Sequence, residues 1–132
     1  PYSWHKKGVV TKFIKSILSD KTLSIYGPLN SSRDYLFVDD LCYGIEKALK
    51  SKIKGCEKIH LSSGKEVTIK KLYKKLIEIS KAKNIKILRK NRRTGEVINN
   101  FSKNQKAKKI LKFKVKNNFN TSLRKTWEWF QK

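Results

Sequence analysis

The sequence predicts a mixed α/β fold, in which small strands alternate with helices, and three observations support this. Short runs rich in β-branched and aromatic residues alternate with segments whose apolar residues recur every three or four positions. No internal repeat and no low-complexity linker divides the chain. Its 132 residues correspond to about one domain and can bury a core without disulfides or metals. The alternation favours α/β or α+β packing in a single domain or fragment that spans residues 1–132.

The first half of the chain is expected to hold two helices and two extended segments. Residues 9–19 have the spacing of an amphipathic helix, and residues 22–26 form a short β-rich run that ends at a Gly-Pro turn. Residues 35–38 are expected to be extended, after which Asp39 or Asp40 caps a second helix. The apolar stripe of that helix consists of Leu41, Cys42, Ile45, Ala48 and Leu49.

The second half is expected to add two strands and three helices. Residues 58–62 have the alternation of a strand, and Thr68 is a suitable N-cap for the helix that follows. Residues 85–88 form a further β-like run, residues 106–111 have a helical pattern, and residues 121–130 form the closing helix. The helix after Thr68 has an apolar side made of Ile69, Leu72, Tyr73, Leu76 and Ile77, and the last helix is anchored by Leu123, Trp127 and Phe130.

The chain is strongly basic, with a formal net charge of +23. Clustered Lys and Arg neutralise phosphates, so this charge is compatible with binding to nucleic acid. Nearly all of the cations are lysines scattered along the whole chain, which is typical of a solvated surface. A basic nucleic-acid- or polyanion-binding module that uses Arg89, Arg92 and Arg93 stays open as an alternative function. No apolar run is long enough to span a bilayer, and no membrane partner is expected.

The cysteines and histidines do not indicate a metal site. Cys42 and Cys56 have no partners at zinc-like spacing, and His5 and His60 lie far apart in the sequence. Because Cys42 falls on the apolar stripe of a helix, we expect a buried, reduced thiol there. That state fits a cytoplasmic protein.

Two arginine positions differ from the lysine background. Arg33 follows a glycine-containing loop and leads into an extended run, and Arg93 lies in the loop R-R-T-G-E, whose glycine allows the backbone to approach a ligand. Arginine beside flexible backbone can clamp phosphate oxygens, because its planar fork donates two parallel bonds. Surface ion pairs, Arg33 with Asp34 or Arg93 with Glu96, are the alternative interpretation.

Seven segments, taken in order, resemble one family. They are G-V-V-T-K-F-I-K-S-I-L (8–18), L-S-I-Y-G (23–27), S-R-D-Y-L-F-V-D-D-L (32–41), H-L-S-S-G-K-E-V-T-I-K-K-L (60–72), R-R-T-G-E-V (92–97), K-A-K-K-I-L-K-F (106–113) and L-R-K-T-W-E-W-F (123–130). Over essentially its whole length the chain resembles the C-terminal, substrate-binding half of the extended short-chain dehydrogenase/reductase family. These are the NAD-dependent nucleotide-sugar epimerases and dehydratases, such as UDP-glucose 4-epimerase.

The resemblance implies a substrate site for a UDP-, GDP- or dTDP-linked sugar. The two arginines match those that grip the diphosphate, and the acid matches the one that hydrogen-bonds the ribose hydroxyls. A serine and a tyrosine match positions that line the nucleobase slot, with a second tyrosine close by, and an isoleucine matches an apolar residue near the nucleoside. In this sequence the implied residues are Arg33, Arg93, Glu96, Ser24, Tyr26, Tyr35 and Ile69.

The family's N-terminal half has no counterpart in the sequence. The glycine-rich NAD loop, the catalytic Ser or Thr and the Tyr-x-x-x-Lys pair are absent, and Pro1 resembles the proline of the family's Y-G-P junction. The resemblance therefore implies that NAD and a 4-keto sugar intermediate belong to a parent enzyme. In that parent, residues 58–62 would join the edge of the cofactor-domain sheet. The chain, an excised piece or a truncated relic, is expected to bind no cofactor, to contain no catalytic residue, to be inactive alone and to self-associate through uncovered apolar faces.

Overall fold

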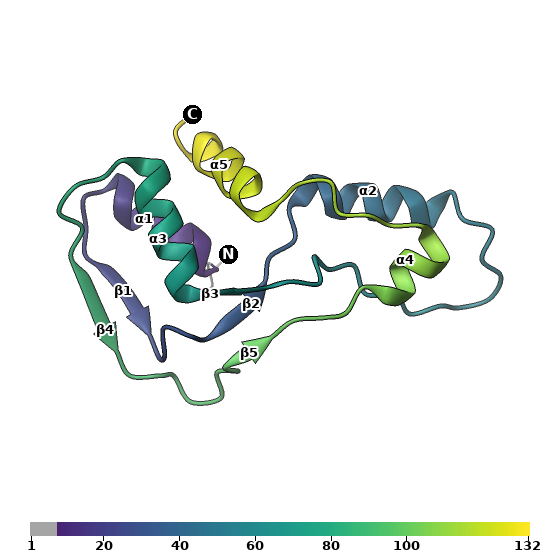
Figure 1. Cartoon of the computed structure of the whole chain (residues 1–132), viewed down its shortest axis with the longest axis horizontal. Coiled ribbons are helices and arrows are strands. Elements are labelled where there is room, and N and C mark those ends of the chain that lie inside the picture. The colour runs from purple at the N-terminus through teal and green to yellow at the C-terminus, as the bar shows by residue number, and fades with distance from the viewer. Residues whose placement is uncertain (1–7) are drawn as a thin grey trace, which may run out of the picture.

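The computed structural model describes residues 8–132, so Pro1 and His5 lie outside the described residues. Within that range the helices are α1 (Val9–Leu18), α2 (Val38–Leu49), α3 (Ile69–Ser80), α4 (Gln105–Leu111) and α5 (Phe119–Phe130). The strands are β1 (Leu23–Tyr26), β2 (Ser32–Asp34), β3 (Glu66–Thr68), β4 (Ile87–Lys90) and β5 (Asn99–Asn100). The molecule is elongated, with α1, α3 and α5 toward one end and α2 and α4 at the other (Figure 1). The mixed α/β class is confirmed.

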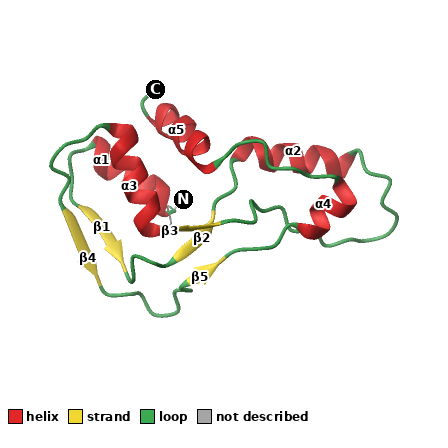
Figure 2. Cartoon of the chain, in the orientation of Figure 1, coloured by secondary structure: helices red, strands yellow, loops and turns green. Residues whose placement is uncertain are grey.

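The strands form two small sheets along one edge of the molecule (Figure 2). β1 pairs in parallel with β4, and β2 lies between β3, to which it is antiparallel, and β5, to which it is parallel. The turn after β1 begins at Gly27, which has a φ of 70°. A side chain there would be strained by that φ, and its Cβ would come within 3.3 Å of the Arg92 side chain. The glycine therefore lets the turn after β1 approach the loop after β4.

The larger of two hydrophobic clusters joins α1, β1, α3 and α5. Helical periodicity explains its membership, because positions three and four apart on each helix point the same way. β1 contributes every second residue, as expected for a strand with one buried face. The buried members are Phe13, Ile14, Ile17, Leu23, Ile25, Ile69, Leu72, Leu76, Leu123 and Trp127.

The smaller cluster lies at the other end, between α2, α4 and the segment around residue 61. Its buried members are Ala107, Leu111 and Phe113. Gly44 in the middle of α2 makes this packing possible, because a Cβ there would come within 2.6 Å of Leu61 Cδ1. The backbone of α2 thus lies directly on the cluster.

Most helix predictions are confirmed. α1, α3 and α5 occupy the expected segments within one or two residues, and Thr68 Oγ1 accepts a hydrogen bond from Lys71 N as an N-cap. Asn118 caps α5 in the same way, accepting from Thr121 N. β4 is displaced by two residues toward the C-terminus from the predicted run 85–88.

The strand predicted at residues 58–62 is wrong, because these residues form no strand. The alternation that suggested it is present, since Ile59 and Leu61 are half-buried and His60 is exposed. The segment lies against α2 and the loop before α4, where Ser62 Oγ donates to Ser102 O at 2.8 Å and Asn104 Nδ2 donates to Ser62 O at 2.9 Å. An alternating segment becomes a strand only beside another strand, and none lies there among the described residues.

The predictions around the start of α2 are also wrong. The strand is Ser32–Asp34, and the helix begins already at Val38, inside the run 35–38 expected to be extended. Neither aspartate caps α2 through its side chain. Asp40 is buried instead, with its carboxylate accepting hydrogen bonds from Lys116 N at 2.8 Å and Asn117 N at 3.2 Å.

Cys42 is exposed, which contradicts the predicted buried thiol. The buried residues of α2 are Asp40 and Gly44, and Cys42 lies about 200° around the helix from Asp40. The apolar stripe read from the sequence therefore faces outward. Its large side chains Leu41, Ile45 and Leu49 have exposed fractions of 40%, 47% and 82%. Val38, which the sequence placed before this helix, begins α2 and is 58% exposed, and it extends the same apolar face.

Candidate functional site

A cavity of about 250 Å³ collects six of the seven residues implied by the resemblance. β1 contributes Ser24 and Tyr26, whose alternation with the buried Leu23 and Ile25 turns them away from the core. β2, the start of α3 and the loop after β4 supply the rest of the wall. The six residues are Ser24, Tyr26, Arg33, Ile69, Arg93 and Glu96.

Arg33 is held by the loop that follows β4. Its Nη1 donates to Ser32 O at 2.7 Å and to Ile98 O at 2.9 Å, and its Nη2 donates to Val97 O at 2.6 Å. Glu96 Oε1 lies 3.9 Å from Nη2 as an ion-pair partner. Three of the five guanidinium N–H donors are thus used on carbonyl groups, which leaves Nε–H and one Nη2–H for another acceptor.

The two ion pairs considered from the sequence are wrong. Arg33 pairs with Glu96, whereas Asp34 accepts hydrogen bonds from Ser63 N at 2.8 Å and Gly64 N at 2.9 Å. Glu96 therefore forms its ion pair with Arg33 on β2 and not with Arg93, which lies in the same loop as Glu96. Apart from Ser32, the partners of Arg33 are Glu96, Val97 and Ile98, which lie more than sixty residues away, so sequence proximity could not indicate them.

Arg93 lies over the ring of Tyr26, with its guanidinium carbon 4.1 Å from the ring centroid. Lys90 Nζ lies 5.6 Å from the same centroid. Hydrogen bonding by Arg93, followed by the charge of Lys90, lowers the pKa of the Tyr26 phenol. The cavity thus has a cation stacked on an aromatic face at one wall and a fixed arginine at another.

Lys12 and Ser31 also line this cavity, and the sequence did not single them out. Lys12 lies on α1 three residues after Val9 and one before Phe13, both of which share the cavity wall. The three-residue spacing was a usable signal, because it places Val9 and Lys12 on one face of the helix. The cavity therefore has three cations, Lys12, Arg33 and Arg93, and one carboxylate, Glu96.

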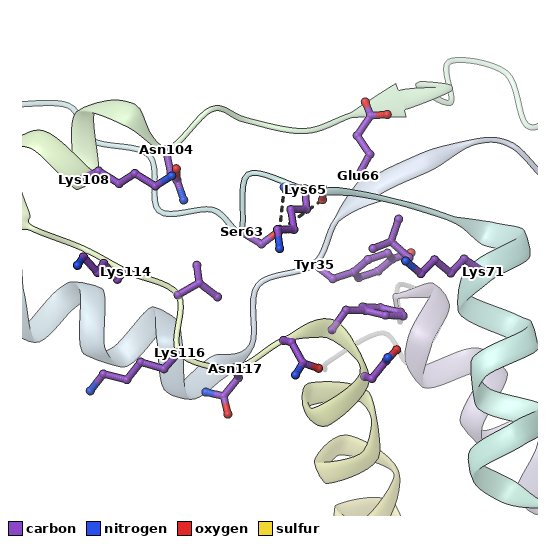
Figure 3. Close-up of a pocket in the computed structure, with 15 residues that line it drawn as sticks. Tyr35, Ser63, Lys65, Glu66, Lys71, Asn104, Lys108, Lys114, Lys116 and Asn117 are labelled. Atoms are coloured by element: carbon purple, nitrogen blue, oxygen red, sulfur yellow. Dashed lines mark hydrogen bonds between the residues drawn. The ribbon is translucent and has the colours of Figure 1, made fainter.

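Tyr35, the seventh residue, lines a different and larger cavity of about 590 Å³ (Figure 3). In a continuing strand Tyr35 would share the face of Arg33, but β2 ends at Asp34. Its ring packs against Phe119 with centroids 5.9 Å apart, and its buried hydroxyl has no hydrogen-bond partner within residues 8–132. Burial raises the pKa of Tyr35 to about 12.

We expect this tyrosine to make stability depend on pH in alkali. Because the folded chain keeps the Tyr35 proton up to about pH 12 and the unfolded chain releases it near pH 10, stability should fall as pH rises from about 10 to 12. Absorbance titration of the phenols should show one late step that Tyr35→Phe removes. If all five tyrosines ionised together near pH 10 in the folded protein, this assignment would be refuted.

Among residues 8–132 there is no group of three His, Cys, Asp or Glu side chains placed to hold a metal ion. No described helix combines the length and apolar character needed to cross a bilayer.

Comparison with known proteins gives the family. A family model described as GDP-mannose 4,6 dehydratase matches residues 5–126. UDP-glucose 4-epimerase 2 of Oryza sativa subsp. japonica is 33% identical over 104 residues, which cover 76% of this chain and 25% of that protein. The chain spans 21% to 36% of the length of the curated relatives it matches.

Solved structures agree with this assignment. The UDP-glucose 4-epimerase of Thermotoga maritima, crystallised with UDP-glucose, is 27% identical in sequence and superposes with a TM-score of 0.89. The match covers 97% of this chain and 40% of the epimerase chain. The UDP-glucuronic acid 4-epimerase of Bacillus cereus, solved with UDP-glucuronic acid and NAD, shares the fold, with a TM-score of 0.88 and 22% sequence identity. The match covers 95% of this chain and 40% of the epimerase chain. The chain therefore belongs to the GDP-mannose 4,6 dehydratase family, among the NAD-dependent nucleotide-sugar epimerases and dehydratases of the extended short-chain dehydrogenase/reductase group.

Proposed function

We propose that this chain binds the nucleoside diphosphate part of a UDP-, GDP- or dTDP-linked sugar in the smaller cavity, as the substrate-binding portion of an epimerase or dehydratase. The observation that carries the proposal is the convergence of six residues on one cavity from three elements and one loop. They are the residues implied by the family resemblance, apart from Tyr35.

The chemistry of the cavity suits such a ligand. Arg93 and Lys12 provide cations for phosphate oxygens, and Arg33, which keeps two N–H donors without a carbonyl partner, lines the same cavity. Glu96 is an acceptor for sugar hydroxyls, and Tyr26 offers a ring beside the apolar Ile69. Binding energy from this remote part of a substrate would position the sugar for chemistry elsewhere.

The described residues do not fit NAD. The turn after β1 leads into β2 and not into a helix. Helices follow β2, β3 and β5, and none of these three strand-to-helix connections contains a glycine. A dinucleotide cradle needs a glycine-rich turn between a strand and a helix N-terminus. We therefore derive no NAD-dependent step from this chain and expect it to be inactive alone, with cofactor and catalytic groups supplied by the parent protein in its cytoplasmic setting.

Substitution of Arg93 tests the site. We expect Arg93→Gln to weaken UDP-glucose binding by about tenfold or more with little loss of stability, since Arg93 is exposed and its side chain lies over the half-buried Tyr26 ring. Arg33→Gln should weaken binding and also destabilise the chain, because it releases Val97 and Ile98. Isothermal titration calorimetry with UDP-, GDP- and dTDP-sugars, paired with thermal unfolding, measures both effects.

Arg124→Gln is the matched control, because it removes the same charge from an exposed position on α5 outside the cavity. Equal weakening by Arg124→Gln and Arg93→Gln, with a steep salt dependence, would indicate diffuse polyanion binding and exclude the proposed site. The same samples, given NAD and UDP-glucose, should form no UDP-galactose.

We expect the chain to self-associate through the exposed apolar face of α2 and not through residues 58–62. The exposed stripe of Val38, Leu41, Ile45 and Leu49 is a continuous apolar face. We expect Ile45→Lys with Leu49→Lys to lower the apparent mass in gel filtration, whereas Leu18→Lys, at an exposed apolar position on α1, should not. A wild-type chain that elutes as a monomer at every concentration would contradict this.

A further inference from the structure

The larger cavity is a second basic site that shares no lining residue with the proposed nucleotide-sugar site. It has a volume of about 590 Å³ and lies between the start of α3, α4 and the loop that joins α4 to α5. Figure 3 shows its lysines arriving from separate parts of the chain, with Lys71 reaching from α3 toward Tyr35 and Lys108 lying on α4 beside Asn104. The lysines that line it are Lys65, Lys71, Lys108, Lys114 and Lys116.

The charge of this cavity is not balanced by the protein. Glu66 is the one carboxylate among its lining residues, and none of the five lysines forms an ion pair within residues 8–132. Lys116 places its Nζ 3.8 Å from the centroid of the Tyr43 ring, which does not line this cavity. A hollow lined by charges of one sign concentrates the field and raises the local concentration of counter-ions. An anion bound there would relieve the mutual repulsion of the lysines.

The kinds of side chain present restrict the ligand. Lysine ammonium groups are compact point charges that suit phosphate oxygens and do not select a planar acceptor. The aromatic residues of the wall, Tyr35 and Phe119, pack against each other, so they do not form a platform for stacking successive bases. Amide groups from Asn104, Asn117, Asn118 and Asn120 complete the polar wall.

We propose that this lysine-lined cavity binds a small ligand with two or more phosphate groups, independently of the nucleotide-sugar site. Lys65, Lys71 and Lys108 hold the phosphates, and Lys114 and Lys116 at the opposite wall raise the local potential. The proposal stands on the cavity and its unpaired ammonium groups and does not depend on the function of the smaller cavity.

Inorganic pyrophosphate is the probe, titrated into the 15N-labelled full chain at constant ionic strength. We expect shifts at the amides of Ser63, Lys65 and Lys116 to Asn118, saturating with one affinity. Lys71→Gln with Lys108→Gln should weaken that affinity by about tenfold or more, because two charged donors are lost. Lys74→Gln with Lys109→Gln is the matched control, since it removes two charges from the same two helices at exposed positions outside the cavity.

Three further outcomes distinguish a defined phosphate site from diffuse charge attraction and from a nucleic-acid site. Equal weakening in both double variants would mean diffuse attraction by the lysine surface and would overturn the proposal. Short oligo-dT that shifts the same amides and binds more tightly than pyrophosphate would replace the small ligand by a nucleic acid. Arg93→Gln should leave the pyrophosphate shifts around Ser63 unchanged, so a loss of nucleotide-sugar binding and a loss of this site are distinguishable.

Discussion

Phe113→Ala is expected to destabilise the chain by about 3–5 kcal/mol. Phe113 has no exposed surface and lies at the centre of the smaller cluster, with its ring 6.3 Å from that of Tyr43. It also lies against the backbone of α2, since a Cβ at Gly44 would come within 3.2 Å of Phe113 Cε2. The truncation would leave a cavity that α2 and α4 cannot close without moving.

Urea unfolding followed by circular dichroism measures this loss, and hydrogen exchange localises it. Because the two clusters are separate, protection should fall first in α2 and α4 and later in α1 and α3. Leu49→Ala is the control, since Leu49 is 82% exposed and should change stability by less than about 0.5 kcal/mol. Similar losses for Phe113→Ala and Leu49→Ala would show that the smaller cluster is not a core.

Asp40→Ala is expected to cost about 2–4 kcal/mol. The Asp40 carboxylate is buried and accepts from the backbone N–H groups of Lys116 and Asn117. These bonds tie the first turn of α2 to the loop that leads from α4 to α5. Their removal leaves two donors without a partner inside the protein.

Asp39→Ala supplies a matched control for this prediction. Asp39 is the neighbouring residue and its carboxylate lies 3.6 Å from Lys125 Nζ, but both side chains are about half exposed. Such a pair contributes at most about 1 kcal/mol. In thermal unfolding, the midpoint temperature of Asp40→Ala should lie far below that of Asp39→Ala. The reverse order would refute the structural role of Asp40.

The helices could be predicted because their signals are local. The three-and-four spacing of α1 and α3 and the Thr68 cap need no partner to be recognised. The residues 58–62 could not be assigned, because strand formation depends on what lies beside the segment. The predictions for Asp40 and Cys42 were wrong for the same reason. The side of α2 that faces the core is the side that packs against Leu61 and Phe113, and both of these residues lie far from α2 in the sequence.

The candidate site shows the same division. Family resemblance implied which residues belong to it, and six of the seven share one cavity. Tyr35 does not, since β2 ends at Asp34, before the run 35–38 that was expected to be extended. The partnership of Arg33 with Glu96, Val97 and Ile98 spans more than sixty residues and had no local signature.

The sequence by itself therefore determined the mixed α/β class, the helices and the family, because periodicity, caps and ordered motifs are properties of neighbouring residues. Only the tertiary structure decided which strands pair, which face of α2 is buried, that Arg33 is fixed by the loop after β4, and that five lysines surround a second cavity. Each of these depends on contacts between segments that the chain brings together only when it folds, and side-chain type alone does not specify them.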